Sequence, residues 1–220
     1  MSVKRAVVFD VDGVLVDSYL AHYESWKLVA EENSLEITEI EFATSFGRTS
    51  REIIADLWPQ HGDSSEWIKS FDERKESLYR EIVEAEFPVM EGAVELIDQL
   101  VAADFKIGVG SSGPPENVAL TLASLERADL FGGVVTGADV SRGKPDPEVF
   151  LTCAERLGVP PGGCAVIEDA AAGVAAANAA GMKSIALVSQ GHHRDEFKDA
   201  ARIVDRLDQL SAQSISELIG

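Results

Sequence analysis

Two carboxylates near the start of the chain have the spacing of a reactive acidic pair. Asp10 and Asp12 are separated by one residue and follow the apolar run at residues 6–9. Because side chains alternate along a strand, residues i and i+2 point the same way, and both acids would enter one crevice. Carboxylates this close need either a raised pKa or a cation. The pair therefore predicts phosphoryl transfer with Mg2+, a hard and oxygen-seeking ion.

Different roles are predicted for the two acids. Asp10 is the candidate nucleophile, because an aspartyl-phosphate divides one difficult displacement into two easier steps. Asp12 is the candidate acid and base, which protonates the leaving oxygen and then deprotonates the acceptor. Asp and Gly are also common turn residues, so an acidic pair in a simple strand-end turn is the alternative.

A second acidic pair, Glu168-Asp169, follows another apolar run at residues 164–167. With the Asp10 carboxylate and the Asp12 backbone carbonyl, these acids offer oxygen ligands for Mg2+, and waters and a substrate phosphate could complete an octahedron. The alternative is that Asp169 only caps the alanine-rich helix that follows it.

Phosphate-binding groups are predicted in two further loops. Ser111 and Ser112 follow the run at residues 106–110, where hydroxyls and backbone N–H groups can cradle phosphate, with Ser111 the preferred contact. Lys144 precedes a proline, which keeps it out of a helix, and its ammonium could offset charge on Asp10 and on a transferring phosphoryl group. Ordinary turn chemistry for the serines and a solvated loop lysine are the alternatives.

Short apolar runs alternate with amphipathic helical stretches along the chain. The predicted strands are residues 5–9, 106–110, 134–136, 164–167, 184–188 and 202–204. This alternation predicts an α/β fold with a doubly wound, Rossmann-like parallel sheet, in which ligands gather at the carboxyl ends of the strands. The candidate residues stand at those ends.

The segment between the first two strands reads almost entirely as helix and is too long for an ordinary crossover. We therefore expect an α/β core at residues 1–17 and 89–220, with an α-helical cap domain inserted at residues 18–88. An insertion that begins beside Asp12 would lie over the site, exclude water and select substrates.

The composition is strongly acidic. Among 220 residues, 19 Lys and Arg face 38 Asp and Glu, a net charge of −19 that disfavours nucleic acid and anionic membranes as partners. Cys153 and Cys164 have the spacing of neither a disulfide framework nor a zinc site, and no apolar run is long enough for a signal peptide or membrane span. We expect a soluble, cytoplasmic monomer or weak homodimer.

The acidic pairs, the strand-end serine and the lysine motif resemble, in their order and spacing, the haloacid dehalogenase superfamily over essentially the whole chain. Asp-Val-Asp-Gly-Val-Leu-Val-Asp-Ser before a helical insertion resembles its β-phosphoglucomutase-like branch, mostly Mg2+-dependent sugar phosphatases with some mutases. The resemblance implies Asp10 as the nucleophile and Asp12 as the acid/base. It implies Ser111 and Lys144 as phosphate ligands. The four metal ligands that it implies are Asp10, Asp12, Glu168 and Asp169.

The predicted cap carries further matches to substrate-contacting positions of that branch. They are His22, Trp26, either Arg48 or Arg51, and Lys75. An arginine could clamp a distal phosphate, Lys75 could bind phosphate or sugar oxygens, and His22 could bond Asp12 or the sugar. Core packing for Trp26 and solvent exposure for the cations are the alternatives.

The favoured function is a Mg2+-dependent phosphatase for a small phosphorylated metabolite of the sugar phosphate type. A sugar phosphate mutase is the close alternative, because it shares the first half-reaction and passes the phosphoryl group to a second sugar hydroxyl. Ser-Ser-Gly-Pro at Ser111 departs from the Lys- and Asn-containing sequence usual for mutases. A phospho-receiver signalling module, shorter and without a large cap, is the alternative from another class.

Overall fold

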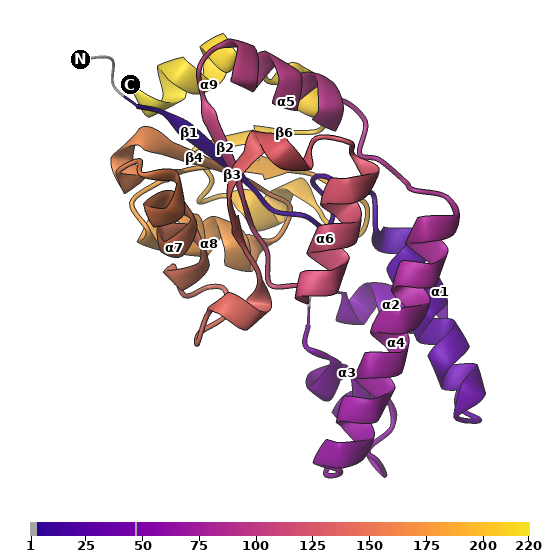
Figure 1. Cartoon of the computed structure of the whole chain (residues 1–220). Coiled ribbons are helices and arrows are strands. Elements are labelled where there is room, and N and C mark those ends of the chain that lie inside the picture. Colours follow the sequence, from indigo (N-terminus) through magenta and orange to yellow (C-terminus); the bar gives the residue numbers. More distant parts are fainter. Residues whose placement is uncertain (1–3, 47) are drawn as a thin grey trace. The chain divides into compact units, whose positions relative to one another are not determined.

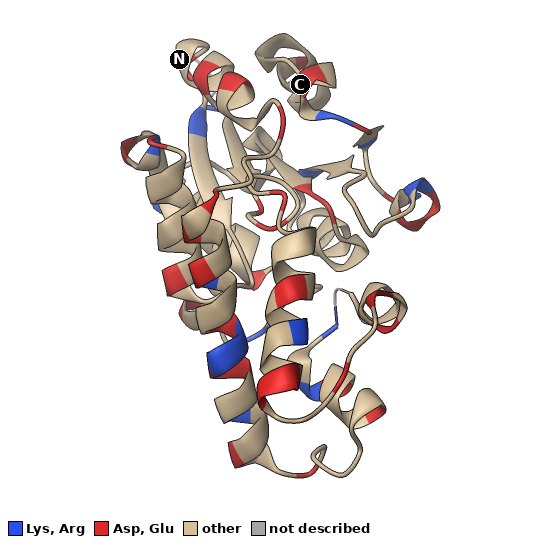
Figure 2. Ribbon diagram, turned by 90° about the vertical axis from the view of Figure 1, so that its right-hand side faces the viewer, with Lys and Arg blue, Asp and Glu red and all other residues tan. Residues whose placement is uncertain are grey.

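The structure is a computed structural model that describes residues 4–46 and 48–220. The chain forms two compact units: Met1–Asp17 with Pro88–Gly220, named the core unit, and Ser18–Phe87, named the cap unit (Figure 1). Asp and Glu are spread over the helices of both units (Figure 2), so neither unit alone carries the acidic charge of the chain.

One parallel sheet organises the core unit. In the described residues, six strands pair in the order β3-β2-β1-β4-β5-β6. Their bounds are β1 Ala6–Phe9, β2 Lys106–Gly110, β3 Phe131–Val135, β4 Cys164–Glu168, β5 Lys183–Leu187 and β6 Arg202–Val204. The strand order runs in opposite directions on the two sides of β1, which confirms the predicted doubly wound fold and places β1 at the topological switch point.

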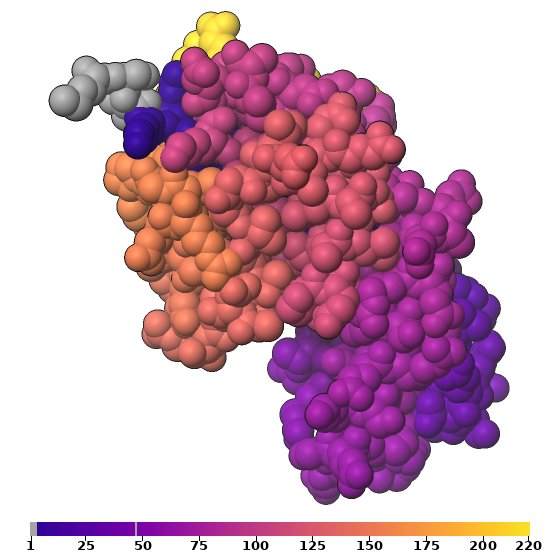
Figure 3. All heavy atoms as spheres, viewed as in Figure 1, coloured from indigo at the N-terminus to yellow at the C-terminus, as the bar shows by residue number. Residues whose placement is uncertain are grey.

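Helices cover both faces of this sheet, which explains why β1 and β4 are apolar runs buried along their length. Helices α7 and α8 pack on one face, and α5 and α9 pack together on the other (Figure 1). The core-unit helices are α5 Ala93–Ala102, α6 Pro115–Ser124, α7 Glu148–Leu157, α8 Ala171–Ala179 and α9 Ala212–Ile219. In Figure 3, the core-unit residues coloured pink to orange form much of the surface that faces the viewer.

Short 3-10 helices occupy several of the connections. They are η1 Ala128–Leu130, η2 Gly137–Asp139, η3 Pro161–Gly163, η4 Arg194–Phe197 and η5 Leu207–Gln209.

The third strand begins earlier than the sequence predicts. The prediction was residues 134–136, whereas β3 spans Phe131–Val135. Consecutive glycines at positions 132 and 133 resemble a turn, but in the sheet they lie beneath α7, where a Cβ at Gly133 would come within 3.2 Å of the Arg156 Cβ. The tertiary packing of α7, absent from any local pattern, therefore decides this boundary.

The cap unit consists of helices α1 Tyr19–Glu32, α2 Glu39–Ser45, α3 Ser50–Leu57 and α4 Ser65–Ala85. Thr38 and Thr49 begin α2 and α3 with capping boxes, in which each threonine and the glutamate three residues later satisfy one another's backbone N–H groups. Among the described residues, no helix is both long and apolar enough to span a membrane.

Candidate active site

The predicted core residues converge where neighbouring parallel strands end. Asp10 directly follows β1, and its backbone N–H donates to the Ile167 carbonyl of β4 at 2.9 Å, which places Asp10 beside Glu168. Ser111 follows β2 and is buried, and its N–H donates to the Val135 carbonyl at the end of β3. The sheet topology thus brings together residues that lie far apart in sequence.

Three carboxylates and one ammonium form the centre of the site. Asp10, Glu168 and Asp169 are buried, and one oxygen from each lies within 4.8 Å of the others. Lys144 Nζ donates to Asp10 Oδ1 at 2.8 Å and to Glu168 Oε1 at 2.7 Å. The Lys144 side chain is 8% exposed, so the alternative of a solvated loop lysine is wrong.

In this cluster three buried acids share a single lysine, and the pKa values of two of the acids are raised. Burial, together with the charge of Glu168, raises the pKa of Asp10 to about 7 despite the opposing effect of Lys144. Burial and the charges of Glu168 and Asp10 also raise the pKa of Asp169 well above its ordinary value. Burial lowers the pKa of Lys144, but the charges of Asp10 and Glu168 raise it overall. Buried carboxylate oxygens that a single lysine does not neutralise fit a hard divalent cation.

Glu168 is held by the first turn of α8. Its Oε2 accepts a hydrogen bond from the Ala170 N–H at 2.8 Å. A Cβ at Gly173 would lie 1.8 Å from Glu168 Oε1, so the carboxylate occupies space that only glycine leaves open. Sequence reasoning missed Gly173, whose signal is that it interrupts an otherwise alanine-rich helix.

Asp169 does not cap α8, so that alternative is wrong. Ala170 is the N-cap residue, and no side chain caps the helix. Asp169 Oδ2 instead accepts a hydrogen bond from Ser189 Oγ at 2.7 Å. Sequence reasoning also missed Ser189, although it stands just beyond β5, at the same end of the sheet as the predicted residues.

Asp12 and Ser111 both lie close to Gly113. A Cβ at Gly113 would be 3.2 Å from Ser111 Oγ and 3.8 Å from Asp12 Oδ2. Ser111 Oγ accepts the Gly113 N–H at 3.0 Å, so the turn chemistry considered for this serine is present. Ser112 is exposed, and its backbone carbonyl lies against Gly137. The loop after β2 therefore presents a buried hydroxyl beside the second acid of the pair.

Lys144 also has an aromatic neighbour that the sequence did not indicate. Its Nζ lies 4.9 Å from the centroid of the Phe150 ring, which belongs to α7 and is fully buried. A cation over an aromatic face is attracted to the ring, so Phe150 helps to retain a buried ammonium.

In the cap unit, the structure brings His22 and Lys75 together. His22 Nδ1 lies 3.1 Å from Lys75 Nζ, and the His22 ring stacks on Tyr79 with centroids 4.2 Å apart. Lys75 Nζ also donates to Glu76 Oε1 at 2.7 Å. Lys75 is buried, so the alternative of a solvent-exposed lysine is wrong.

The two candidate arginines have different partners. Arg48 forms an ion pair with Asp56 at 2.7 Å. Arg51 donates to the neutral Ser65 hydroxyl at 3.0 Å. Arg48 is therefore paired with a carboxylate, whereas the contact given for Arg51 within residues 4–46 and 48–220 is to a neutral hydroxyl.

Trp26 occupies the packing role that the sequence left open for it. The residue is 4% exposed, and its ring packs against Trp58 and Phe71, with centroids 6.2 and 5.6 Å away. It belongs to the hydrophobic core of the cap unit.

Comparisons with known proteins agree with this architecture. Residues 4–181 match the family model described as haloacid dehalogenase-like hydrolase. The chain is 32% identical to a β-phosphoglucomutase of Bacillus subtilis, over 85% of this chain and 84% of that protein. It is also 32% identical to a phosphorylated carbohydrates phosphatase of Thermotoga maritima, over 82% and 83% respectively. A crystal structure of β-phosphoglucomutase from Clostridium difficile superimposes with a TM-score of 0.84 at 27% identity, covering 98% of this chain and 97% of the other.

Proposed function

Because the chain belongs to the haloacid dehalogenase-like hydrolases, we propose that it is a Mg2+-dependent phosphatase for small phosphate monoesters of the sugar phosphate type. The observation that carries this proposal is the buried cluster in which Lys144 bridges Asp10 and Glu168 beside Asp169. It combines a carboxylate nucleophile, a fixed ammonium and oxygen donors for a cation, which are the groups that phosphoryl transfer needs.

In the first step, an Asp10 carboxylate oxygen attacks phosphorus and the ester P–O bond breaks. Asp12, in its acid form, gives a proton to the leaving oxygen, so the alcohol departs neutral. In the second step, Asp12 removes a proton from water, whose oxygen attacks the phosphorus of the aspartyl-phosphate. This displaces the Asp10 carboxylate, releases inorganic phosphate and returns Asp12 to its acid form.

The other core residues bind and orient the phosphoryl group. Lys144 holds Asp10 Oδ1, which fixes the rotation of the nucleophile and places positive charge beside the reacting phosphorus. Ser111 and nearby backbone N–H groups bind phosphoryl oxygens.

The carboxylates of Asp10, Glu168 and Asp169, with the Asp12 backbone carbonyl, would hold Mg2+. When bound, the ion supplies additional positive charge that offsets the charge of the transferring phosphoryl group.

The cap unit is inserted directly after the Asp10-Asp12 loop, and we assign to it the selection of the substrate. Lys75 has Glu76 as an ion-pair partner, and Arg48 has Asp56. Paired cations are poor binders of a second phosphate. With sugar hydroxyls, however, the ammonium of such a pair can donate hydrogen bonds and its carboxylate can accept them. This supports a monophosphate with a hydroxyl-bearing remainder.

A sugar phosphate mutase is the second candidate, favoured by similarity to the Bacillus subtilis β-phosphoglucomutase. A mutase must retain a bisphosphate intermediate, and of the two candidate arginines Arg51, whose described contact is the neutral Ser65 hydroxyl, is the better placed to bind a second phosphate. Similarity to the Thermotoga maritima phosphatase and the paired state of Arg48 and Lys75 favour the hydrolytic reaction. Membership in a hydrolase family favours multiple turnover over a phospho-receiver module.

The proposal is tested with a panel of sugar phosphates and other small monoesters, with and without Mg2+, by measuring inorganic phosphate. We expect multiple turnovers with the wild type and a loss of about a thousandfold or more in Asp10→Asn, because the nucleophile is removed. Asp129→Asn, an exposed aspartate of the core unit, is the matched control and should remain active.

A parallel reaction with β-glucose 1-phosphate and a bisphosphate primer separates the two candidates. Conversion mainly to glucose 6-phosphate, with little inorganic phosphate, would replace phosphatase by mutase. Near-normal turnover by a folded Asp10→Asn protein would refute the covalent mechanism for both.

A further inference from the structure

The Asp169 carboxylate accepts a hydrogen bond from a residue just beyond β5, and the proposed mechanism gives that residue no role. Ser189 Oγ donates to Asp169 Oδ2 at 2.7 Å. Ser189 follows β5, and the backbone at Ser189 and just before it is anchored. The Ser189 N–H donates to the Leu187 carbonyl, and the Val188 N–H donates to the Val204 carbonyl of β6. The hydroxyl is thus fixed relative to the sheet.

The same carboxylate oxygen also lies against Gly13. A Cβ at Gly13 would lie 1.7 Å from Asp169 Oδ2 and 3.1 Å from Ser189 Oγ, and the glycine has a φ of +67°. Asp169 Oδ2 therefore occupies a space bounded by the Gly13 backbone and the Ser189 hydroxyl. Fixing one carboxylate oxygen sets the rotation of the side chain, and with it the direction in which the other oxygen points.

This restraint is needed because neighbouring charges repel Asp169. The carboxylates of Asp10 and Glu168 both lie within reach of the same cation site. Lys144 contacts those two acids. A second ammonium at Asp169 would compete with a metal ion for the carboxylate, whereas a neutral hydroxyl holds it without adding charge.

We propose that Ser189 is a positioning residue for the cation site, which holds Asp169 in the orientation that binds a divalent ion. The inference rests on the proposed function, because it assigns a purpose to the metal ligand Asp169. The expected direct effect of Ser189 is on the affinity for the cation, and any change in the rate of phosphate release follows from that.

The test compares Ser189→Ala and Ser189→Thr with the wild type by calorimetric titration of Mg2+ into the metal-free protein. We expect Ser189→Ala to weaken Mg2+ binding by roughly 10–100-fold, the usual effect of removing a residue that orients a metal ligand. Ser189→Thr retains the hydroxyl and should keep most of the affinity. In phosphate release, Ser189→Ala should need more Mg2+ for half-maximal rate and recover activity at saturating Mg2+.

Ser184→Ala is the matched control. Ser184 lies on β5, the strand that precedes Ser189. It is fully buried and donates to Asn178 Oδ1 at 2.8 Å, so the variant also loses a serine hydrogen bond. It should lower the thermal midpoint without changing Mg2+ affinity.

Unchanged Mg2+ affinity in Ser189→Ala overturns the inference. An equal loss of affinity in Ser184→Ala, or in Ser189→Thr, also overturns it, because the effect would then not come from the hydroxyl. If the wild type itself neither binds Mg2+ nor releases phosphate from any ester, the proposed function fails instead. The two failures are therefore distinguishable.

Discussion

At the scale of single residues, the site depends as much on absent side chains as on present ones. Gly13 leaves space for Asp169, and Gly173 leaves space for Glu168. A buried carboxylate that packs against backbone has few other orientations, so the two glycines confine the predicted metal ligands sterically. Hydrogen bonds from Ala170 and Ser189 then fix the remaining freedom.

Replacing Gly173 by alanine tests this confinement. A glycine-to-alanine change inside a helix normally stabilises a protein by about 1 kcal/mol. The new Cβ would meet Glu168 Oε1 at 1.8 Å, so the carboxylate or α8 must move. We expect a lower thermal midpoint and a loss of at least about tenfold in Mg2+ affinity, measured by thermal unfolding and calorimetric titration.

Gly162→Ala provides the control for Gly173→Ala. Gly162 lies in η3, and a Cβ there meets nothing within 4 Å. It should change neither Mg2+ affinity nor activity. A Gly173→Ala protein with the raised midpoint of an ordinary helical substitution and intact Mg2+ binding would contradict the steric argument.

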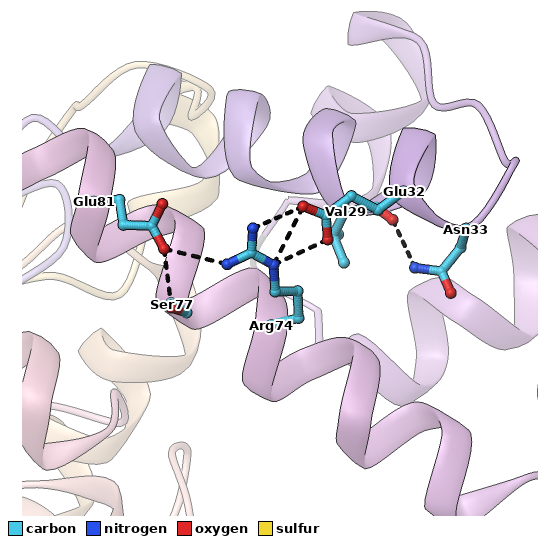
Figure 4. Close-up of polar contacts among 6 residues, drawn as sticks. All are labelled: Val29, Glu32, Asn33, Arg74, Ser77 and Glu81. Carbon is cyan, nitrogen blue, oxygen red and sulfur yellow. Dashed lines mark hydrogen bonds and ion pairs between the residues drawn. The ribbon is translucent and has the colours of Figure 1, made fainter.

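At the scale of elements, an exposed ion-pair cluster links α1 and α4 in the cap unit. Arg74 of α4 binds both oxygens of Glu32, in the last turn of α1, and also contacts Glu81 (Figure 4). Its neighbour Lys75 turns instead to His22. Adjacent residues on a helix do not share a face, so this Arg-Lys pair divides into a structural cation and a candidate substrate contact.

Removing the Arg74 charge should loosen the packing of α1 on α4 slightly. All three side chains are at least 42% exposed, so water screens the pairs and their contribution is small. We expect Arg74→Met to lower the thermal midpoint by less than Trp26→Ala, a core truncation that costs about 3–5 kcal/mol. Lys69→Met, which removes a pair 3.7 Å long with 77% lysine exposure, is the control and should have less effect.

The difference between wild type and Arg74→Met should also depend on pH. Hydrogen bonds from Arg74 lower the pKa of Glu32 from its ordinary value of 4.5. A lowered folded-state pKa stabilises the protein above the unfolded pKa, and this contribution disappears as the pH falls through the folded value. The midpoint difference should therefore be full at neutral pH and shrink below pH 4.5. A difference that is unchanged in strong acid would assign the effect to packing of the arginine stem.

At the scale of the whole molecule, salts should affect stability in two ways, through the net charge of −19 and through the buried acidic site. Diffuse self-repulsion is reduced by any salt, because added ions screen exposed charges. The buried carboxylate cluster should respond specifically to a divalent cation that binds the folded state alone.

Mg2+ should therefore raise the thermal midpoint more than NaCl at equal ionic strength. At 100 times its Kd, a ligand stabilises the folded state by about 2.7 kcal/mol. For a chain of this length, that corresponds to roughly 5–10 °C. Asp169→Asn, which removes a predicted ligand, should keep the NaCl response and lose the additional effect of Mg2+. Equal midpoints in the two salts would argue against a specific divalent site.

The sequence alone determined where strands and acids follow one another along the chain, because both are local patterns. Each predicted acid or hydroxyl stands where an apolar run ends, as Asp10, Ser111 and Glu168 do, and parallel strands bring such ends to one edge of the sheet. Only the tertiary structure decided the partners of those groups. Ser189 and Gly13 position Asp169 through a hydrogen bond and close packing, and Lys75 of α4 contacts His22 of α1. No spacing along the chain encodes such contacts, because they depend on how separate elements pack.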